Sequence, residues 1–171
     1  GPFRQAPRLA ALMDKEPERW RNGVVVIFIG VNDWVRTLDL QLRDPGAPEL
    51  GTVIARCTRR IAESMSMLRE RQPDLRFLVI GLDNPANDPS NADKFRSAAQ
   101  IQNLRVALAR YNASLREMID NTPGTAYFDQ DAWFHGLWGD RDAQGQARYR
   151  AVTLGDGFKV TNTRGDEPHN V

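Results

Sequence analysis

Residues 24–34 read VVVIFIGVNDW, in which six apolar residues run directly into Gly-Val-Asn-Asp and a tryptophan. The run from Val24 to Ile29 is continuous and rich in β-branched residues, which is typical of a parallel strand covered on both faces. Gly30 has no Cβ, so a substrate or a neighbouring backbone can approach it closely. Asn32 then offers an uncharged N–H donor just past the strand end. We therefore expect a buried strand that is followed directly by polar side chains available to a ligand.

Helical and strand patterns alternate on both sides of this stretch. A helical pattern covers residues 8–19, and apolar residues repeat at helical spacing over 52–71 and over about 94–119. Strands are expected over 76–82 and 125–128. This alternation is typical of a parallel sheet flanked by helices. The predicted fold class is α/β, a three-layer α/β/α sandwich with helices on both faces of the sheet.

Polar residues follow all three predicted strands. Gly30 to Asp33 follow the first strand, Asp83 and Asn84 follow the second, and residues 129–133 follow the third. Right-handed crossovers between parallel strands place their carboxyl ends along one edge, where sites in such sheets lie. We therefore expect these three segments to share one edge.

The composition excludes several classes of function. The 171 residues include 23 basic and 22 acidic side chains, for a net charge of +1, which gives no footprint for nucleic acid or an anionic membrane. The longest apolar run has the length of a strand, so no membrane span is expected. Cys57 is the only cysteine, which excludes an intramolecular disulfide and a thiolate metal cluster. A chain without disulfides is compatible with any compartment.

An asparagine just past a strand end suits acyl-transfer chemistry. One well-aimed N–H donor to the negative oxygen that develops in such a reaction is worth about 3 kcal/mol. Asp33 is suited to capping the turn or helix that follows. Asparagine and aspartate are also common in ordinary turns. From the residues alone, a catalytic and a purely structural role for Asn32 both stay open.

Gly30-Val31-Asn32-Asp33, placed after a strand, resembles the third signature block of the SGNH hydrolases, also called the GDSL esterase/lipase superfamily. The resemblance implies a flavodoxin-like fold and a Ser-His-Asp triad that cleaves acyl or acetyl esters, including those of carbohydrates. Asn32 would donate to the oxyanion, and Gly30 would shape the oxyanion pocket. No metal or organic cofactor is implied.

The chain departs from this family in having no Gly-Asp-Ser block. Its serines lie within helical patterns or, for Ser90, in a polar loop: Ser64, Ser66, Ser90, Ser97 and Ser114. None follows a strand on a sharp turn, so helix surface or capping explains them better. We therefore expect a single domain over residues 1–171 that is truncated at both ends, with its nucleophile encoded upstream of Gly1.

The late histidine has two interpretations. Asp166 and His169 match an Asp-x-x-His block, and an aspartate so placed can orient an imidazole that acts as general base. Residues 148–162, however, look like a hairpin with its turn at 155–157, and similar sequences carry the true pair after such a hairpin. Either Asp166 and His169 complete the triad, or the pair lies beyond Val171.

Aromatic residues gather near the predicted edge. Trp34 adjoins the oxyanion donor, and residues 131–140, DAWFHGLWGD, carry Trp133 and His135 after the third strand. Indoles there can stack on a sugar ring or wall an acyl pocket. Trp34, Asp33 and Trp133 are therefore the predicted substrate-binding residues, with core packing as the alternative for the indoles. His135 has no acidic partner at a short fixed spacing and is expected to be a loop residue.

Two other functions compete with the esterase. A non-catalytic α/β module that binds glycans or a partner is favoured by the missing nucleophile. A nucleotide-binding flavodoxin-like domain is disfavoured, because no glycine-rich phosphate loop follows any strand.

Overall fold

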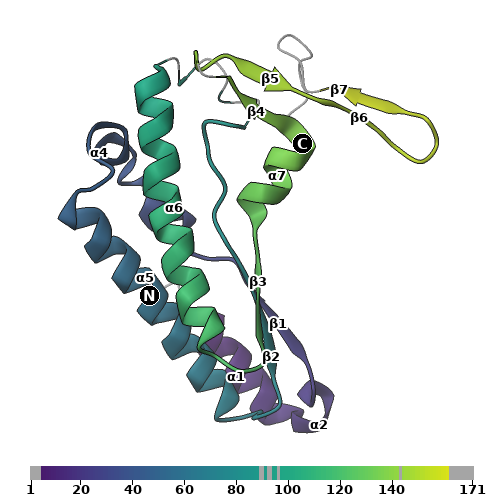
Figure 1. The fold of residues 1–171 in the computed structure, drawn as a ribbon. Coiled ribbons are helices and arrows are strands. Elements are labelled where there is room, and N and C mark those ends of the chain that lie inside the picture. The colour runs from purple at the N-terminus through teal and green to yellow at the C-terminus, as the bar shows by residue number, and fades with distance from the viewer. Residues whose placement is uncertain (1–4, 89–90, 92–93, 96, 143, 162–171) are drawn as a thin grey trace.

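The computed structural model describes residues 5–88, 91, 94–95, 97–142 and 144–161. Its centre is a parallel sheet of three strands, β1 (Val24–Ile27), β2 (Arg76–Ile80) and β3 (Thr125–Phe128). The strands lie in the order β1-β2-β3, so β2 pairs with both others (Figure 1). The predicted parallel sheet is therefore confirmed. The first two strands end two residues earlier than their apolar runs.

Seven helices are described: α1 (Gln5–Lys15), α2 (Pro17–Trp20), α3 (Val31–Val35), α4 (Leu38–Arg43), α5 (Pro48–Arg69), α6 (Ala98–Asp120) and α7 (Gln130–Trp138). The helix predicted over 8–19 is divided at Pro17, which has no N–H for an interior helical bond and instead opens α2. The helices α5 and α6 match the two long helical patterns. Pro48 occupies the first turn of α5, a position where proline is tolerated. None of the described helices is long and apolar enough to cross a membrane.

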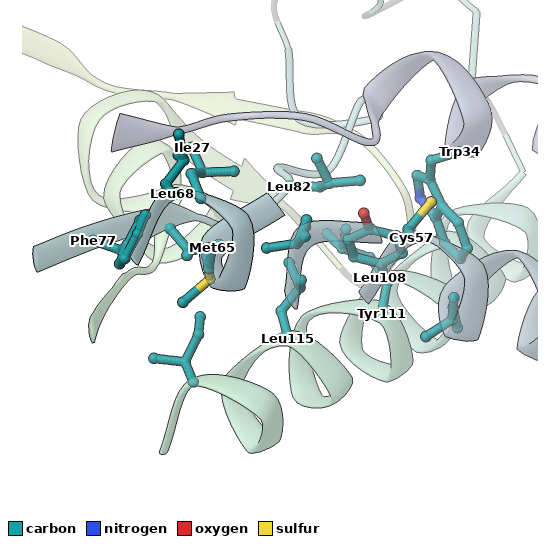
Figure 2. Packing of buried hydrophobic residues seen from close by; sticks show 14 of the residues in the cluster. Ile27, Trp34, Cys57, Met65, Leu68, Phe77, Leu82, Leu108, Tyr111 and Leu115 are labelled. Carbon is teal, nitrogen blue, oxygen red and sulfur yellow. The ribbon is translucent and has the colours of Figure 1, made fainter. Parts of the chain in front are cut away.

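The core lies between the sheet and the apolar stripes of α5 and α6 (Figure 2). Met65 and Leu68 of α5, Leu115 of α6 and Phe77 of β2 are buried members of this one cluster. The spacing of these residues within each helix is the one that the sequence predicts for a buried stripe. One contiguous core therefore fixes the position of the sheet against the helices α1, α5 and α6.

The opposite face of the sheet is open among the described residues. Val24 and Val26 are 55% and 57% exposed, and the register places Val26 beside Leu78, on the face opposite Phe77. The long helices all lie on the other side of the sheet (Figure 1). The expectation that β1 is covered on both faces is therefore wrong for the described part of the chain. A continuous apolar run predicts a strand, but it does not identify the element that packs on each face.

Two antiparallel hairpins follow the sheet. The strand β4 (Gly139–Arg141) pairs with β5 (Ala147–Tyr149), and β6 (Ala151–Thr153) pairs with β7 (Lys159–Thr161). The second pair confirms the hairpin predicted within residues 148–162.

Candidate functional site

The carboxyl end of β1 turns directly into the short helix α3 through Gly30. Gly30 has a φ of 109°, a backbone conformation that favours glycine, and it caps the N-terminus of α3. Its carbonyl accepts a hydrogen bond from the Trp34 N–H at 2.9 Å. Asn32, in the first turn of α3, is exposed, and its side chain makes no hydrogen bond to the described residues. An amide donor is thus presented at the predicted edge of the sheet.

The buried side chain of Trp34 holds α3 against the core. Its side chain is 3% exposed, and its ring lies 5.0 Å from that of Tyr111 at a tilt of 53° (Figure 2). Its carbonyl accepts hydrogen bonds from Thr37 Oγ1 at 2.7 Å and from Gln41 Nε2 at 2.8 Å. The predicted role of Trp34 in binding substrate therefore needs correction, because a side chain so deeply buried offers no open platform. The alternative account, core packing, describes it.

Tyr111 lies beneath the turn at Gly30. A Cβ added at Gly30 would lie 2.1 Å from Tyr111 Oη, so only glycine fits there without movement. Within the described residues this hydroxyl has no hydrogen-bond partner. The neighbouring Cys57 thiol is close enough to affect its pKa, but it is not placed to make a hydrogen bond of normal geometry. Burial, and then the thiol, raises the pKa of Tyr111, so the phenol stays neutral.

Asp33 lies on the side of α3 that faces α5. Its carboxylate is 3.4 Å from the guanidinium of Arg56, and both side chains are about half exposed. Gly30 occupies the cap position that the sequence offered to Asp33. Asp33 instead places a negative charge in the first turn, where the helix dipole favours it. Its predicted contact with substrate stays a prediction.

The ends of β2 and β3 are tied together, as the shared edge predicts. Gln130 Nε2 donates to Asp83 Oδ1 at 2.7 Å, and the Asn84 N–H donates to Asp131 Oδ1 at 2.9 Å. Burial raises the pKa of Asp131, while the hydrogen bond from Asn84 opposes the shift. Asp129 caps the N-terminus of α7 with its side chain. These carboxylates therefore hold loops in place at this edge.

His135, expected as a loop residue, lies in the helix α7 (Gln130–Trp138), and Trp133 of this helix contacts two other aromatic rings. Trp133 is 52% exposed, with its ring 6.3 Å from that of Phe128 and 4.8 Å from that of Phe134. Trp133 thus remains the exposed indole of the two that were predicted to bind substrate.

His135 has an acidic partner that the sequence did not reveal. Its Nδ1 lies 3.4 Å from Asp140 Oδ2, and Asp140 also forms an ion pair with Arg105. The partner was missed because His135 and Asp140 belong to different elements, α7 and β4, whose relative placement no fixed sequence spacing predicts. The described residues therefore place one imidazole nitrogen within 3.4 Å of a carboxylate oxygen.

A buried guanidinium fixes the loop that follows β2. Arg141 donates to the carbonyls of Ala86 at 2.6 Å, Phe95 at 3.0 Å and Gly145 at 2.9 Å. Sequence reasoning did not single out Arg141. Its burial depends on three carbonyls, and no local motif in the sequence indicates that they converge.

Asp166 and His169 lie outside the described residues, as does Ser90. Ser64, Ser66 and Ser114 lie within α5 and α6, and Ser97 caps α6, so no described serine stands on a strand-to-helix turn. The described part of the chain also contains no group of three or more His, Cys, Asp or Glu residues that could hold a metal ion.

Comparisons of the chain with protein-family models, with curated proteins and with solved structures gave no significant match.

Proposed function

We propose that this protein is a serine ester hydrolase of the SGNH type, in which Asn32 donates a hydrogen bond to the oxyanion. One observation carries the proposal: an exposed amide side chain, free of hydrogen bonds to the described residues, follows a glycine turn at the carboxyl end of a parallel strand. An amide that is already engaged in the fold would be unable to serve a substrate.

The chemistry assigns one task to each group. A serine hydroxyl attacks the ester carbonyl, and negative charge develops on the carbonyl oxygen as the tetrahedral intermediate forms. The Nδ2–H of Asn32 stabilises that charge, and the turn at Gly30 shapes the oxyanion pocket by setting where α3 begins. The proposal places the nucleophilic serine outside these 171 residues. A late Asp–His pair, Asp166 and His169 or one beyond Val171, removes the proton of the serine.

The finer fold belongs to the same proposal. A flavodoxin-like, three-layer sandwich needs a second helical layer over the face of the sheet that carries Val24 and Val26. Parallel sheets are nearly always covered on both faces. The apolar character of the open face supports this layer.

Kinetics of the full-length protein test the proposal. Asn32→Ala is expected to lower kcat by roughly 10² to 10³ and to leave KM nearly unchanged, because the amide acts mainly on the charged transition state. Asn121→Ala is the control, since Asn121 is an exposed asparagine at the C-cap of α6, where its side chain donates to the carbonyl of Glu117 at 2.8 Å. A wild-type kcat for Asn32→Ala would refute the oxyanion assignment and the family proposal together.

The identity of the base is tested in the same protein. Loss of activity in His169→Ala with an active His135→Ala assigns the base to His169. The reverse result assigns it to the pair of His135 and Asp140, which the structure brings within 3.4 Å. Activity in both variants places the base beyond Val171.

A non-catalytic module is the second candidate. The observation that favours it is the exposed pair Phe128 and Trp133, whose rings lie 6.3 Å apart, together with the lack of a described serine on a strand-to-helix turn. Exposed indoles stack on the apolar faces of sugars. Two results together would favour this candidate. A glycan would quench the tryptophan fluorescence saturably, and the quenching would be lost in Trp133→Ala. Asn32→Ala would have the same activity as the wild type in every ester assay.

A further inference from the structure

The helix α3 carries the proposed donor but has little stability of its own. It contains five residues, and isolated helices of this length do not form in water. The side chain of Asn32 contributes no hydrogen bond to the described residues that would fix it. The orientation of Asn32 therefore depends on what holds the residues on either side of it.

Two residues that flank Asn32, Gly30 and Trp34, contact the same side chain. Gly30, two residues before Asn32, lies against the hydroxyl of Tyr111, and the ring of Trp34, two residues after it, packs on the ring of Tyr111. Tyr111 belongs to the middle of α6 and is fully buried, so it is part of the rigid core (Figure 2). The short helix is thus supported at both ends by one fixed residue.

We propose that Tyr111 is a positioning residue, whose hydroxyl supports the turn at Gly30 and thereby aims the amide of Asn32. The inference rests on the proposed function, because it assigns Tyr111 a role in the same oxyanion site. Tyr111 acts through Asn32 and does not itself touch the substrate.

The contact with Gly30 is made by the oxygen of Tyr111 rather than by its ring. A Cβ at Gly30 would lie 2.1 Å from Oη but 3.3 Å from Cζ. A buried hydroxyl without a hydrogen-bond partner is unfavourable, and a phenylalanine would fill the core equally well. Support of the turn explains why an oxygen stands at this position.

The chain provides a matched control in Tyr127. Its hydroxyl is also buried without a hydrogen bond of normal geometry among the described residues, while the guanidinium of Arg116 lies close enough to affect its pKa. The hydroxyl lies against Gly81, where a Cβ would be 2.1 Å away. Gly81 follows β2 rather than β1. The next residue, Leu82, is held independently by Asn112, which bonds both its N–H and its carbonyl. Loss of this hydroxyl likewise removes an oxygen that lies against a glycine at a strand end, but it does so beneath the turn after β2 rather than the turn that precedes Asn32.

The experiment compares ester kinetics and thermal unfolding of the full-length protein for Tyr111→Phe, Tyr127→Phe, Asn32→Ala and the double variant Tyr111→Phe/Asn32→Ala. Tyr111→Phe is expected to lower kcat about 10- to 100-fold with little change in KM, since a displacement of about 1 Å at a catalytic group has an effect of this size. Tyr127→Phe is expected to keep the wild-type kcat. Neither variant is expected to lower the Tm, because each removes a buried, unpaired hydroxyl.

The double variant separates positioning from a general structural role. If Tyr111 acts through Asn32, Tyr111→Phe causes no further loss of kcat once Asn32 is alanine. An additive loss, or an equal loss in Tyr127→Phe, would overturn the inference. A wild-type kcat in Tyr111→Phe beside a large loss in Asn32→Ala would overturn it while the proposed function stands. A wild-type kcat in Asn32→Ala would overturn both.

Discussion

The hydroxyl of Tyr111 lies against the backbone of Gly30, where a Cβ would be only 2.1 Å from it. Gly30 also has a φ of 109°. Two independent features therefore require glycine at this position: the backbone conformation and the space. Gly30→Ala is expected to lower the free energy of unfolding by about 2 to 4 kcal/mol, the sum of strain and overpacking. Chemical denaturation of the purified chain measures it.

The two contributions can be separated with Tyr111→Phe. In that background the nearest atom to an alanine Cβ at position 30 is Cζ at 3.3 Å, so the clash is largely relieved while the strain of the positive φ remains. The double variant is therefore expected to recover part of the loss. At Gly81 the ring carbon of Tyr127 would still be 2.7 Å from the Cβ, so Tyr127→Phe is expected to rescue Gly81→Ala poorly. Equal rescue at both positions would contradict this account of the contacts.

The two tryptophans that were predicted to bind substrate should differ in their effect on stability. Trp34 is buried against Tyr111, so Trp34→Ala is expected to cost about 3 to 5 kcal/mol. Trp133 is 52% exposed, and Trp133→Ala is expected to change the free energy of unfolding by less than about 0.5 kcal/mol. Urea unfolding of both variants beside the wild type measures the difference. Equal losses would mean that Trp133 is buried in solution.

The parallel sheet and both long helices were predictable from the sequence, because hydrophobic periodicity reports burial directly. The apolar run from Val24 to Ile29 identified a strand, and the stripe of Ile61, Met65 and Leu68 marked the buried face of α5. The same signal does not say which element covers a face, so the open side of β1 was not foreseen.

The candidate site was predictable only in part. The position of Gly30 and Asn32 followed from the order of strand and turn, since a short motif after a strand fixes its own place at the sheet edge. The support from Tyr111 did not follow, because a long-range contact between α6 and a turn some 80 residues earlier leaves no local pattern. The sequence left core packing of Trp34 open as an alternative and did not decide for it, for the same reason.

The chain of 171 residues by itself is expected to hydrolyse short-chain p-nitrophenyl esters no faster than buffer. The described serines have structural roles in helices. Ser64 donates a hydrogen bond to the carbonyl of Arg60 at 2.8 Å, and the Ser97 side chain accepts a hydrogen bond from the Gln100 N–H at the N-terminus of α6. An oxyanion donor without an activated nucleophile gives little turnover. Release of p-nitrophenol is followed over a range of substrate concentrations. Saturable activity that disappears when one serine is changed to alanine would show that this serine is the nucleophile.

The turn between β4 and β5 is expected to depend on pH through Asp142. The N–H of Gln146 donates to this carboxylate at 2.9 Å and is the main reason why the pKa of Asp142 lies below its ordinary value of 3.8, with Arg148 and Gln144 acting in the same direction. The unfolded chain therefore binds the proton more tightly than the folded chain. The contribution to stability is present above about pH 4 and is lost as the pH falls through the lowered pKa.

Hydrogen exchange at the amides of Gln144 and Gln146 reports this loss. Protection at both amides, corrected for the intrinsic rate, is expected to hold at pH 5 to 7 and to fall below about pH 4, in step with protonation of the carboxylate. In Asp142→Asn the amides are expected to be poorly protected at every pH, because the neutral side chain accepts weaker hydrogen bonds. Protection that is unchanged down to pH 2, or the same pH profile in Asp142→Asn, would show that another group controls the turn.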